Sequence, residues 1–294
     1  DKEAVLANGI VDPKDADLIV PHIDIELSGD FIYKNRILML DIIANNHWER
    51  PIYFSGGAFG DDDYLWMKDY LQLDGVAYKL VPIKTPVDPR NPYQMGRIDS
   101  DKMYDIVMDW DWGESGNPDI YHDTETRRNS ITYRSNLARL ADQLIKERQF
   151  DRAETILDLG MEKMPVDLFE YYSLLDPFVW NYYEIGALEK ARLVFEQTTQ
   201  KHREYLQYYG QMSVQNQLDH IEEIYSKMNQ YEGLVLLVNA FDQASYYQMT
   251  KDKFLEDVSL FRSLFDRVGL DIDEEFLQNE RPINKIDQAE SDLN

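Results

Sequence analysis

The sequence predicts an α+β fold, in which a small mixed α/β module is followed by an array of antiparallel helix pairs. Short apolar runs separated by turn residues fill the first part of the chain, and prolines crowd the connector 85–96. From about residue 131 onward prolines become rare and apolar residues recur with a helical period. We therefore expect a module over 1–125, a helical domain over 126–281 and a polar tail over 282–294.

Local patterns within the module predict three strands and three helices. Alternation of polar and apolar residues predicts a half-buried strand at 22–27. Further strands are predicted at 77–84 and at 50–55, where Pro51 stands at the start of the strand and its missing N–H is tolerated. The predicted helices cover 37–46, 64–73 and 103–108.

The helical domain carries two copies of a pattern that is typical of tetratricopeptide repeats. Small or apolar residues stand where two antiparallel helices approach each other, and a proline closes the first pair. The alanines Ala153 and Ala191 lie 38 residues apart, slightly more than the usual spacing of about 34. The match predicts architecture and says nothing about catalysis. The matching residues are Leu137, Leu140, Ala141, Leu144, Ala153, Leu157, Gly160 and Pro165, then Phe178, Val179, Tyr182, Gly186, Ala191 and Phe195.

A further amphipathic stripe predicts a helix that closes the array. Gly269 follows the stripe directly, at the position of a left-handed C-terminal cap. The apolar residues of the stripe are Phe254, Val258, Phe261, Phe265 and Val268.

Composition excludes several classes of function. Acidic residues outnumber basic ones by 55 to 30, and the formal net charge of −25 argues against nucleic acid and anionic membrane surfaces as main partners. Because cysteine is absent, disulfides, thiolate zinc sites and cysteine nucleophiles are excluded. No apolar run reaches the roughly 18 to 20 residues that span a bilayer. With no signal peptide and no initial methionine, the chain is expected to be a piece of a larger protein.

Two clusters could bind a metal ion, and each has a simpler interpretation. His22, Asp24 and Glu26 share one face of the predicted strand and could ligate a divalent cation, although a solvated strand face explains them better. Asp61-Asp62-Asp63 lacks the ligand spacing of an EF-hand loop, which favours a helix N-cap before Tyr64. We therefore expect no metal and no cofactor.

Several carboxylates invite a structural or a catalytic interpretation. Asp41 interrupts an apolar helix and Arg50 begins the next strand, so we expect a buried ion pair, with a catalytic acid as the alternative. Asp109, Asp111 and Asp123 stand beside aromatic rings, a combination common in sugar sites and equally common in loops that pin domains together. No nucleophile elbow, phosphate-binding glycine loop or zinc helix is recognisable.

The predicted binding site is a groove between the module and the helix pairs, for a peptide or a lipid-linked sugar phosphate. Tyrosine and tryptophan offer stacking area, and arginine can pair with phosphate or carboxylate in an otherwise acidic chain. The alternative is that these side chains only cement the junction of the two domains. They are Trp110, Trp112, Tyr121, Tyr133, Arg134, Arg139, Tyr182 and Tyr183.

Several separate blocks of sequence resemble one bacterial family. The blocks are ILMLDIIANNHWERPIYF at 37–54, YLQLDGVAYKLVP at 70–82, the pairs at 103–104 and 112–113, YHD at 121–123, and the repeat at 140–165. In this order they resemble the C-terminal soluble region of the domain of unknown function 2723 family, multi-pass membrane proteins described as protein O-mannosyltransferase-like. The resemblance covers roughly residues 20 to 200.

The resemblance implies a parent protein that is a glycosyltransferase, with a polytopic membrane portion followed by a periplasmic domain. In such enzymes the catalytic acid lies in the membrane portion, so none is expected in this chain. The implied function is that of a non-catalytic accessory domain, which presents an acceptor protein or a lipid-linked sugar to the membrane portion of the same polypeptide and binds no nucleic acid. The alternative is an autonomous carbohydrate-active enzyme that uses Asp109, Asp111 or Asp123.

Overall fold

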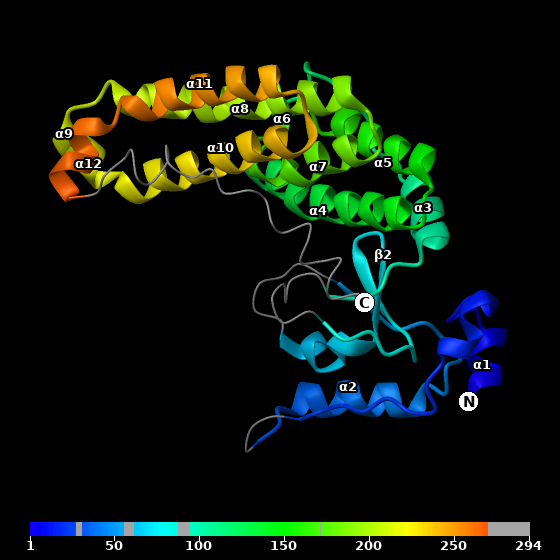
Figure 1. Ribbon diagram of the computed structural model, residues 1–294. Helices are drawn as coiled ribbons and strands as arrows, with labels where there is room; N and C mark the ends of the chain where they lie inside the picture. Colours follow the sequence, from blue (N-terminus) through cyan, green and yellow to red (C-terminus); the bar gives the residue numbers. More distant parts are fainter. Residues whose placement is uncertain (28–30, 56–61, 88–94, 171, 270–294) are drawn as a thin grey trace. The chain divides into compact units, whose positions relative to one another are not determined.

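A computed structural model describes residues 1–27, 31–55, 62–87, 95–170 and 172–269 (Figure 1). This described part is mostly helical and contains a small antiparallel sheet, which agrees with the predicted α+β class. The chain divides into two compact units, unit 1 (Asp1–Gly113) and unit 2 (Glu114–Asn294). The sequence placed this boundary at about residue 125. The division falls earlier because the connecting loop packs on the helical unit, where Ser115 Oγ donates to the Lys163 carbonyl at 2.8 Å.

The sheet of unit 1 has the strand order β1-β3-β2, with both pairs antiparallel. Its strands are β1 (Tyr53–Ser55), β2 (Leu71–Asp74) and β3 (Ala77–Leu80). The tight β2–β3 turn requires Gly75, whose φ is +69° and whose position would place a Cβ 2.8 Å from the Trp110 ring.

A buried network of polar side chains lies on this sheet. Lys79 Nζ lies 3.4 Å from Asp74 Oδ2, and both side chains are buried. Gln72 Nε2 donates to Asp74 Oδ1 at 2.8 Å, and the Tyr53 hydroxyl donates to Asp74 Oδ2 at 3.1 Å. Burial lowers the pKa of Lys79, although the Asp74 carboxylate opposes this. The Asp74 carboxylate thus has three polar partners in the interior, as a buried charge requires.

The remaining elements of unit 1 surround the sheet. A small apolar cluster joins the N-terminal segment to the strand end, and consists of Val5, Ile10, Val11, Val81 and Ile83. The helices are α1 (Lys2–Ala7), η1 (Pro13–Leu18), α2 (Lys34–Asn45), η2 (Asp62–Tyr70) and α3 (Ser100–Met108).

Two predictions for the module are wrong. Residues 22–27 form no strand, because the segment joins no β-ladder in the described part of the chain. The alternation itself is present, since Ile23 and Ile25 are less exposed than their neighbours. The helix predicted at 64–73 is the 3-10 helix η2 followed directly by β2. Here the pairing of Leu71 and Leu73 with β3 overrides the local apolar pattern.

The predicted buried pair of Asp41 and Arg50 is also wrong. Asp41 is exposed on α2, where its carboxylate accepts a hydrogen bond from Asn45 Nδ2 at 3.0 Å. Arg50 is exposed as well. The apolar sequence of this helix suggested burial, yet α2 has no buried residue at all.

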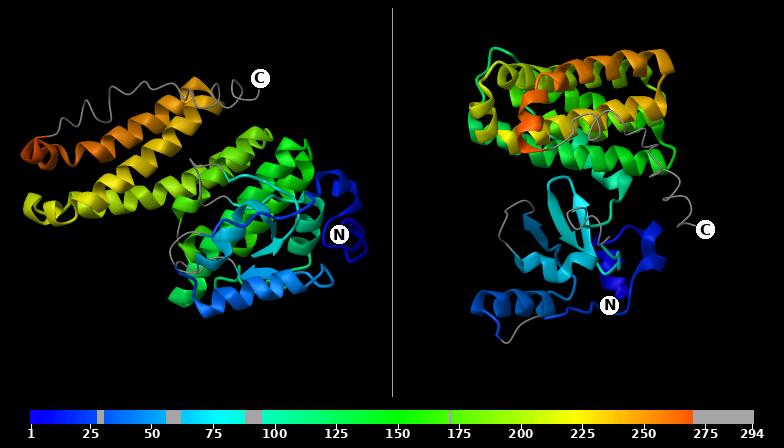
Figure 2. Two further views of the ribbon diagram at one scale, coloured as in Figure 1. Left: turned by 90° about the horizontal axis from the view of Figure 1, so that it is seen from below. Right: turned by 60° about the vertical axis from the view of Figure 1, so that its left-hand side comes forward.

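Unit 2 is built from helices that pack as antiparallel neighbours. The helix α4 contacts α5, α7 contacts α8, and α8, α10 and α11 contact one another along their lengths (Figures 1 and 2). Within the described ranges, none of the helices is both long and apolar enough for a membrane crossing. The elements are α4 (Thr124–Lys146), α5 (Phe150–Lys163), α6 (Val166–Phe169), η3 (Tyr172–Leu175), α7 (Asp176–Glu184), α8 (Leu188–Gly210), α9 (Val214–Asp219), α10 (Ile221–Phe241), α11 (Ala244–Ser259) and α12 (Arg262–Val268).

Small residues let the helices of unit 2 approach closely. A Cβ at Gly160 of α5 would lie 2.8 Å from the Phe178 ring of α7, so the glycine is required by this packing. Ala153 and Ala191 are fully buried. The assignment of these pairs to the tetratricopeptide family stays a prediction, since packed helix pairs alone do not identify that repeat.

The predicted closing helix is in fact two helices. The stripe from Phe254 to Phe265 is buried, but the chain breaks between α11 and α12. Gly269 ends α12 with φ +74°, which confirms the predicted left-handed cap. The predicted polar tail 282–294 lies outside the described residues.

Candidate functional site

Among the described residues of unit 2, one cavity lies between α5, α7 and α8, and a smaller one lies between α8, α10 and α11. We call the first the α5–α8 groove. Its volume is about 430 Å³, within the roughly 300–1,000 Å³ of small-molecule sites. Its apolar lining comes from two places, the end of α5 with the start of α6, and the first turns of α8. These residues are Met161, Pro165, Val166, Leu193 and Val194.

Leu193 is the most informative apolar residue of the groove. Its neighbour Val194 is buried in the helix packing, whereas Leu193 remains 56% exposed. Both residues line the cavity. A large aliphatic side chain that is open to solvent beside a cavity offers apolar area to a ligand.

The polar side of the groove is held rigidly by Asp158. The Tyr182 hydroxyl donates to Asp158 Oδ1 at 2.8 Å, while Lys190 Nζ donates to Asp158 Oδ2 and to Glu154 Oε1, each at 2.6 Å. Burial, followed by the hydrogen bond to Asp158, raises the pKa of Tyr182. Burial lowers the pKa of Lys190, but the hydrogen bonds to Asp158 and Glu154 outweigh it and raise the pKa above its ordinary value. The phenol therefore stays neutral and the amine stays charged near neutral pH.

The lining of the groove is acidic. Three carboxylates, those of Asp158, Glu162 and Asp167, face the single ammonium of Lys190. The side chains of Glu162 and Asp167 are mostly exposed and reach lysines from the outer surface. Such exposed ion pairs are weak, so these carboxylates remain available to a cationic ligand.

The smaller cavity has a different chemistry. It lies among α8, α10 and α11, with a volume of about 220 Å³. Arg203 and Lys253 line it together with the rings of Tyr231 and Tyr246. Arg203 Nε already donates to Asp257 Oδ2 at 2.7 Å, whereas Lys253 is an exposed lysine at the rim.

Arg134 and Tyr183, both predicted from the sequence to bind a ligand, have partners within the chain. Arg134 is fully buried, and its guanidinium donates to the carbonyls of Met164 (2.8 Å) and Glu170. Burial lowers the pKa of Arg134 to about 10, so it stays charged at neutral pH. The Tyr183 hydroxyl donates to Asp242 Oδ2 at 2.8 Å. Arg134 therefore binds the chain's own backbone and cannot reach a ligand, contrary to the prediction.

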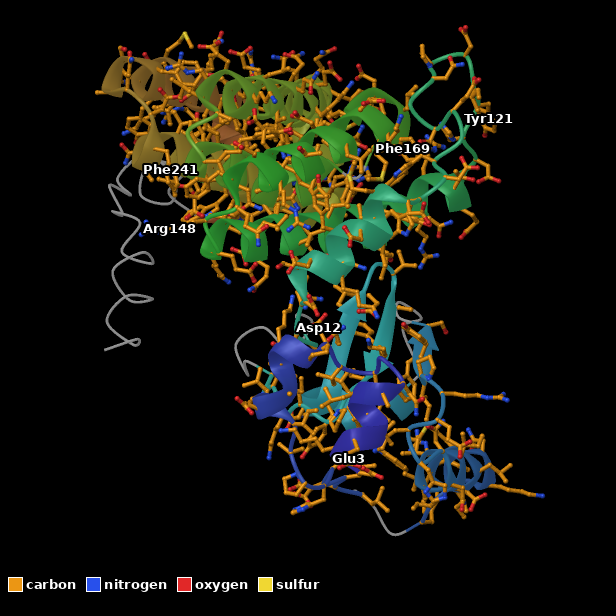
Figure 3. All side chains as sticks on the ribbon, turned by 90° about the vertical axis from the view of Figure 1, so that its right-hand side faces the viewer. Glu3, Asp12, Tyr121, Arg148, Phe169 and Phe241 are labelled. Atoms are coloured by element: carbon orange, nitrogen blue, oxygen red, sulfur yellow. The ribbon has the colours of Figure 1, made fainter. Side chains whose placement is uncertain are left out.

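The other predicted binding residues are distributed over both units. Tyr182 lines the α5–α8 groove, and Tyr133 and Arg139 are half-buried on α4. Tyr121 is exposed on the loop before α4 (Figure 3). Trp110 and Trp112 belong to unit 1, with ring centroids 5.3 Å apart in an edge-on arrangement. Because the structure describes each unit by itself, the groove predicted between them stays a prediction.

Two of the three carboxylates proposed for a sugar site, those of Asp111 and Asp123, accept hydrogen bonds from the local backbone. Asp123 is the N-cap of α4 and accepts from Thr126 N at 2.7 Å, and this hydrogen bond lowers the pKa of Asp123. Asp111 accepts from Gly113 N at 2.9 Å. Asp109 is the C-cap of α3 and is exposed.

The metal candidates do not form a ligand cluster in the described residues. His22 Nε2 lies 3.6 Å from Asp24 Oδ1, and both side chains are mostly exposed. Glu26 is also exposed. The Asp61-Asp62-Asp63 cluster lies outside the residues whose side chains are described.

Sequence reasoning missed the residues that shape the α5–α8 groove. Glu154 and Asp158 are four residues apart on α5, so they share a helix face, and Lys190 lies in the first turn of α8. This spacing is a detectable signal of one acidic face on α5. It does not reveal that α8 brings an exposed leucine beside that face.

Comparisons with known proteins bear mainly on unit 1. Residues 1–102 match the family model of TMEM260-associated domain 2, a domain of unknown function. No curated protein matches the chain, and no solved structure matches it.

Proposed function

We propose that this chain is a non-catalytic accessory region that holds an acceptor polypeptide for a membrane-embedded, glycosyltransferase-like protein. The α5–α8 groove is the binding site for the polypeptide. The observation that carries the proposal is the exposed Leu193 side chain within a groove of about 430 Å³, beside the buried walls of Val166 and Val194. Apolar area next to fixed polar groups is the usual composition of a ligand site.

The chemistry of the groove favours a polypeptide with basic and apolar side chains. An aliphatic side chain of the ligand would cover Leu193, while lysine or arginine would approach Glu162 and Asp167. A phosphate backbone is disfavoured, because the three carboxylates of the lining exceed the one ammonium of Lys190. The ligand we propose is therefore an extended, basic segment of an acceptor protein.

The proposed setting is the periplasmic side of a membrane protein, with the membrane portion in the same polypeptide. It is supported by the resemblance to the domain of unknown function 2723 family at 37–54 and 70–82. It is also supported by the match of residues 1–102 to TMEM260-associated domain 2. The family-model match lies in unit 1, whereas the resemblance extends to about residue 200 and so includes part of unit 2, where the groove lies.

A non-catalytic role is favoured over an autonomous carbohydrate-active enzyme. The Asp123 carboxylate caps α4 and the Asp111 carboxylate closes a turn, while Asp109 is an exposed residue at the end of α3. A carboxylate that acts as catalytic acid needs a raised pKa, whereas that of Asp123 is lowered. Hydrolysis of any member of a glycan panel by this chain, abolished by Asp123→Asn, would support the enzyme instead.

The smaller cavity favours a second ligand, the phosphate of a lipid-linked sugar. Arg203 and Lys253 bring two cations to one cavity beside the Tyr246 ring, and the Glu196 carboxylate in the same lining accepts from the Tyr246 hydroxyl. A ring next to two cations suits a sugar phosphate. A sugar 1-phosphate should raise the melting temperature of the wild-type chain. It should not raise the melting temperature of Lys253→Ala, because this variant lacks one of the two cations. Without ligand the variant should melt like the wild type, since the exposed Lys253 side chain contributes little to the fold.

The peptide proposal is tested by fluorescence anisotropy with a short labelled peptide that repeats Lys-Leu-Ser. Leu193→Lys should weaken binding at least about tenfold, because it removes apolar contact and repels the peptide. Tyr208→Lys, an exposed position on the same helix outside the groove, is the matched control. Equal affinities of both variants and of the wild type, at unchanged melting temperatures, would contradict the proposal.

A further inference from the structure

The helix α2 of unit 1 exposes large apolar side chains. Ile37, Leu38 and Ile42 are 54%, 55% and 61% exposed, and Phe31 and Tyr33, just before the helix, are 70% and 60% exposed. We call these five residues with Lys34 and Asp41 the α2 face. Single exposed apolar residues are normal on a protein surface, but a contiguous set of this size marks an interaction surface.

The charged residues occupy defined places on this face. Successive helix residues are about 100° apart, so Lys34, Leu38 and Asp41 form a row along the exposed side of α2. Ile37 and Ile42 flank this row on either side. The less exposed residues of the helix lie on its opposite side, and they are Arg36, Met39, Leu40 and Ile43.

The α2 face is complementary to itself. The midpoint between Ile37 and Leu38 lies as far from Lys34 as from Asp41, and as far from Tyr33 as from Ile42. An antiparallel second copy, related by a two-fold axis at this midpoint, would therefore place each lysine opposite an aspartate. Tyr33 and Ile42 lie on opposite sides of the helix and only flank this contact. A two-fold contact repeats every such pair, as an isologous interface does.

Both charges are free to take part in such a contact. In the described part of the chain, Lys34 has no ion-pair partner. The Asp41 carboxylate accepts from Asn45 Nδ2 at 3.0 Å and retains lone pairs for a further partner. The face carries one charge of each sign in a chain of net charge −25, so the meeting of two copies here avoids the repulsion expected elsewhere on the surface.

The exposed area is consistent with a weak dimer. Five large side chains, each more than half exposed, offer on the order of 500 Å² per copy, so that a pair buries about 1,000 Å². This is the lower end for a specific interface.

From this self-complementarity we infer that α2 is a homodimerisation helix, and that its occupant is the α2 helix of a second copy, antiparallel across a two-fold axis. Lys34 of each chain pairs with Asp41 of the other, around a centre made by Ile37 and Leu38. This inference concerns unit 1 and is independent of the peptide groove in unit 2.

A charge-swap experiment tests the pairing, with size-exclusion chromatography and light scattering as the readout. The wild-type chain should show a concentration-dependent dimer. K34E alone and D41K alone should both be monomeric at the same concentrations, because each places like charges opposite each other twice. An equimolar mixture of K34E and D41K should recover the dimer, since every contact then joins an acid and an amine again.

Each outcome decides for or against the inference. Both substitutions are at exposed positions, so the circular dichroism spectrum and the melting temperature of each variant should match those of the wild type. A change in either would reveal a folding defect and distinguish it from a loss of dimerisation. Monomeric wild type at the highest concentration, dimeric single variants, or a mixture that stays monomeric would each overturn the inference. So would binding of the monomer through Leu38 to vesicles of anionic phospholipid, which would identify a lipid surface as the occupant.

Discussion

In unit 1 a buried charged network lies on the sheet and an apolar helix is exposed, whereas unit 2 buries its apolar residues between helices and leaves cavities at their surface. The three short strands of unit 1 offer too little area to cover α2, which has no buried residue. In unit 2 the long helices α8 and α10 bury each other's apolar faces, and α4 buries its own against α5 and α7. The difference suggests distinct roles, with unit 1 suited to assembly and unit 2 to ligand binding.

The largest loss of stability is expected when a buried charge of unit 1 is removed. Asp74→Ala removes the partner of Lys79 and leaves an uncompensated ammonium inside, at a cost of about 3–5 kcal/mol in the free energy of unfolding. Urea denaturation followed by far-ultraviolet circular dichroism measures this loss. The double variant Asp74→Leu with Lys79→Met should recover much of it. A loss below about 1 kcal/mol for the single variant would show that Lys79 finds water or loses its proton at little cost.

The next largest loss of stability is expected when the close helix packing of unit 2 is disturbed. Gly160→Ala places a Cβ 2.8 Å from the Phe178 ring, and such overpacking should cost about 1–3 kcal/mol. Adding Phe178→Leu provides space and should recover part of the loss. Gly233→Ala, a helical glycine with open space around its Cβ position, is the matched control and should be neutral or stabilising. Equal melting temperatures for Gly160→Ala and Gly233→Ala would refute the packing argument.

A smaller, pH-dependent effect is expected at Asp176, in the first turn of α7. Burial raises the pKa of Asp176 to about 7, and its Oδ1 is buried without a hydrogen-bond partner in the described residues. A carboxyl with a raised pKa binds its proton more tightly in the folded state. Its stabilising contribution is therefore complete below the unfolded pKa of about 4 and is lost as pH rises through about 7.

Asp176→Asn should remove this pH dependence. The variant cannot ionise, so its stability relative to the wild type should grow between about pH 4 and pH 8, to a difference on the order of 1–3 kcal/mol. Melting temperatures of both proteins over this range measure the difference. Parallel profiles would mean that the folded Asp176 titrates at its ordinary pKa.

Much of the fold follows from local sequence signals, and the exceptions have a physical reason. The helical period after residue 131 predicts the helices of unit 2, and Gly269 predicts the end of the last one, because both signals are local. The exposure of Asp41 could not be predicted. A helix that is apolar all round does not reveal which side is covered, or whether the covering partner is in the same chain.

The candidate site was less predictable than the fold. Arg134 and Tyr183 are residue types that often bind ligands. In the structure, however, Arg134 donates to backbone carbonyls and Tyr183 donates to the Asp242 carboxylate. The α5–α8 groove arises where Asp158, Lys190 and Leu193 meet through packing of separate helices. No local pattern specifies such a meeting, whereas local patterns do specify helices.

Hydrogen–deuterium exchange in the presence of the Lys-Leu-Ser peptide tests the central claim, that unit 2 binds a basic polypeptide in the α5–α8 groove. Addition of the peptide should slow amide exchange at 158–167 and at 190–197, with little change in α10 and α11. A peptide that repeats Glu-Leu-Ser should have no such effect, because the acidic lining repels it. Protection confined to unit 1, or equal protection by both peptides, would contradict the claim.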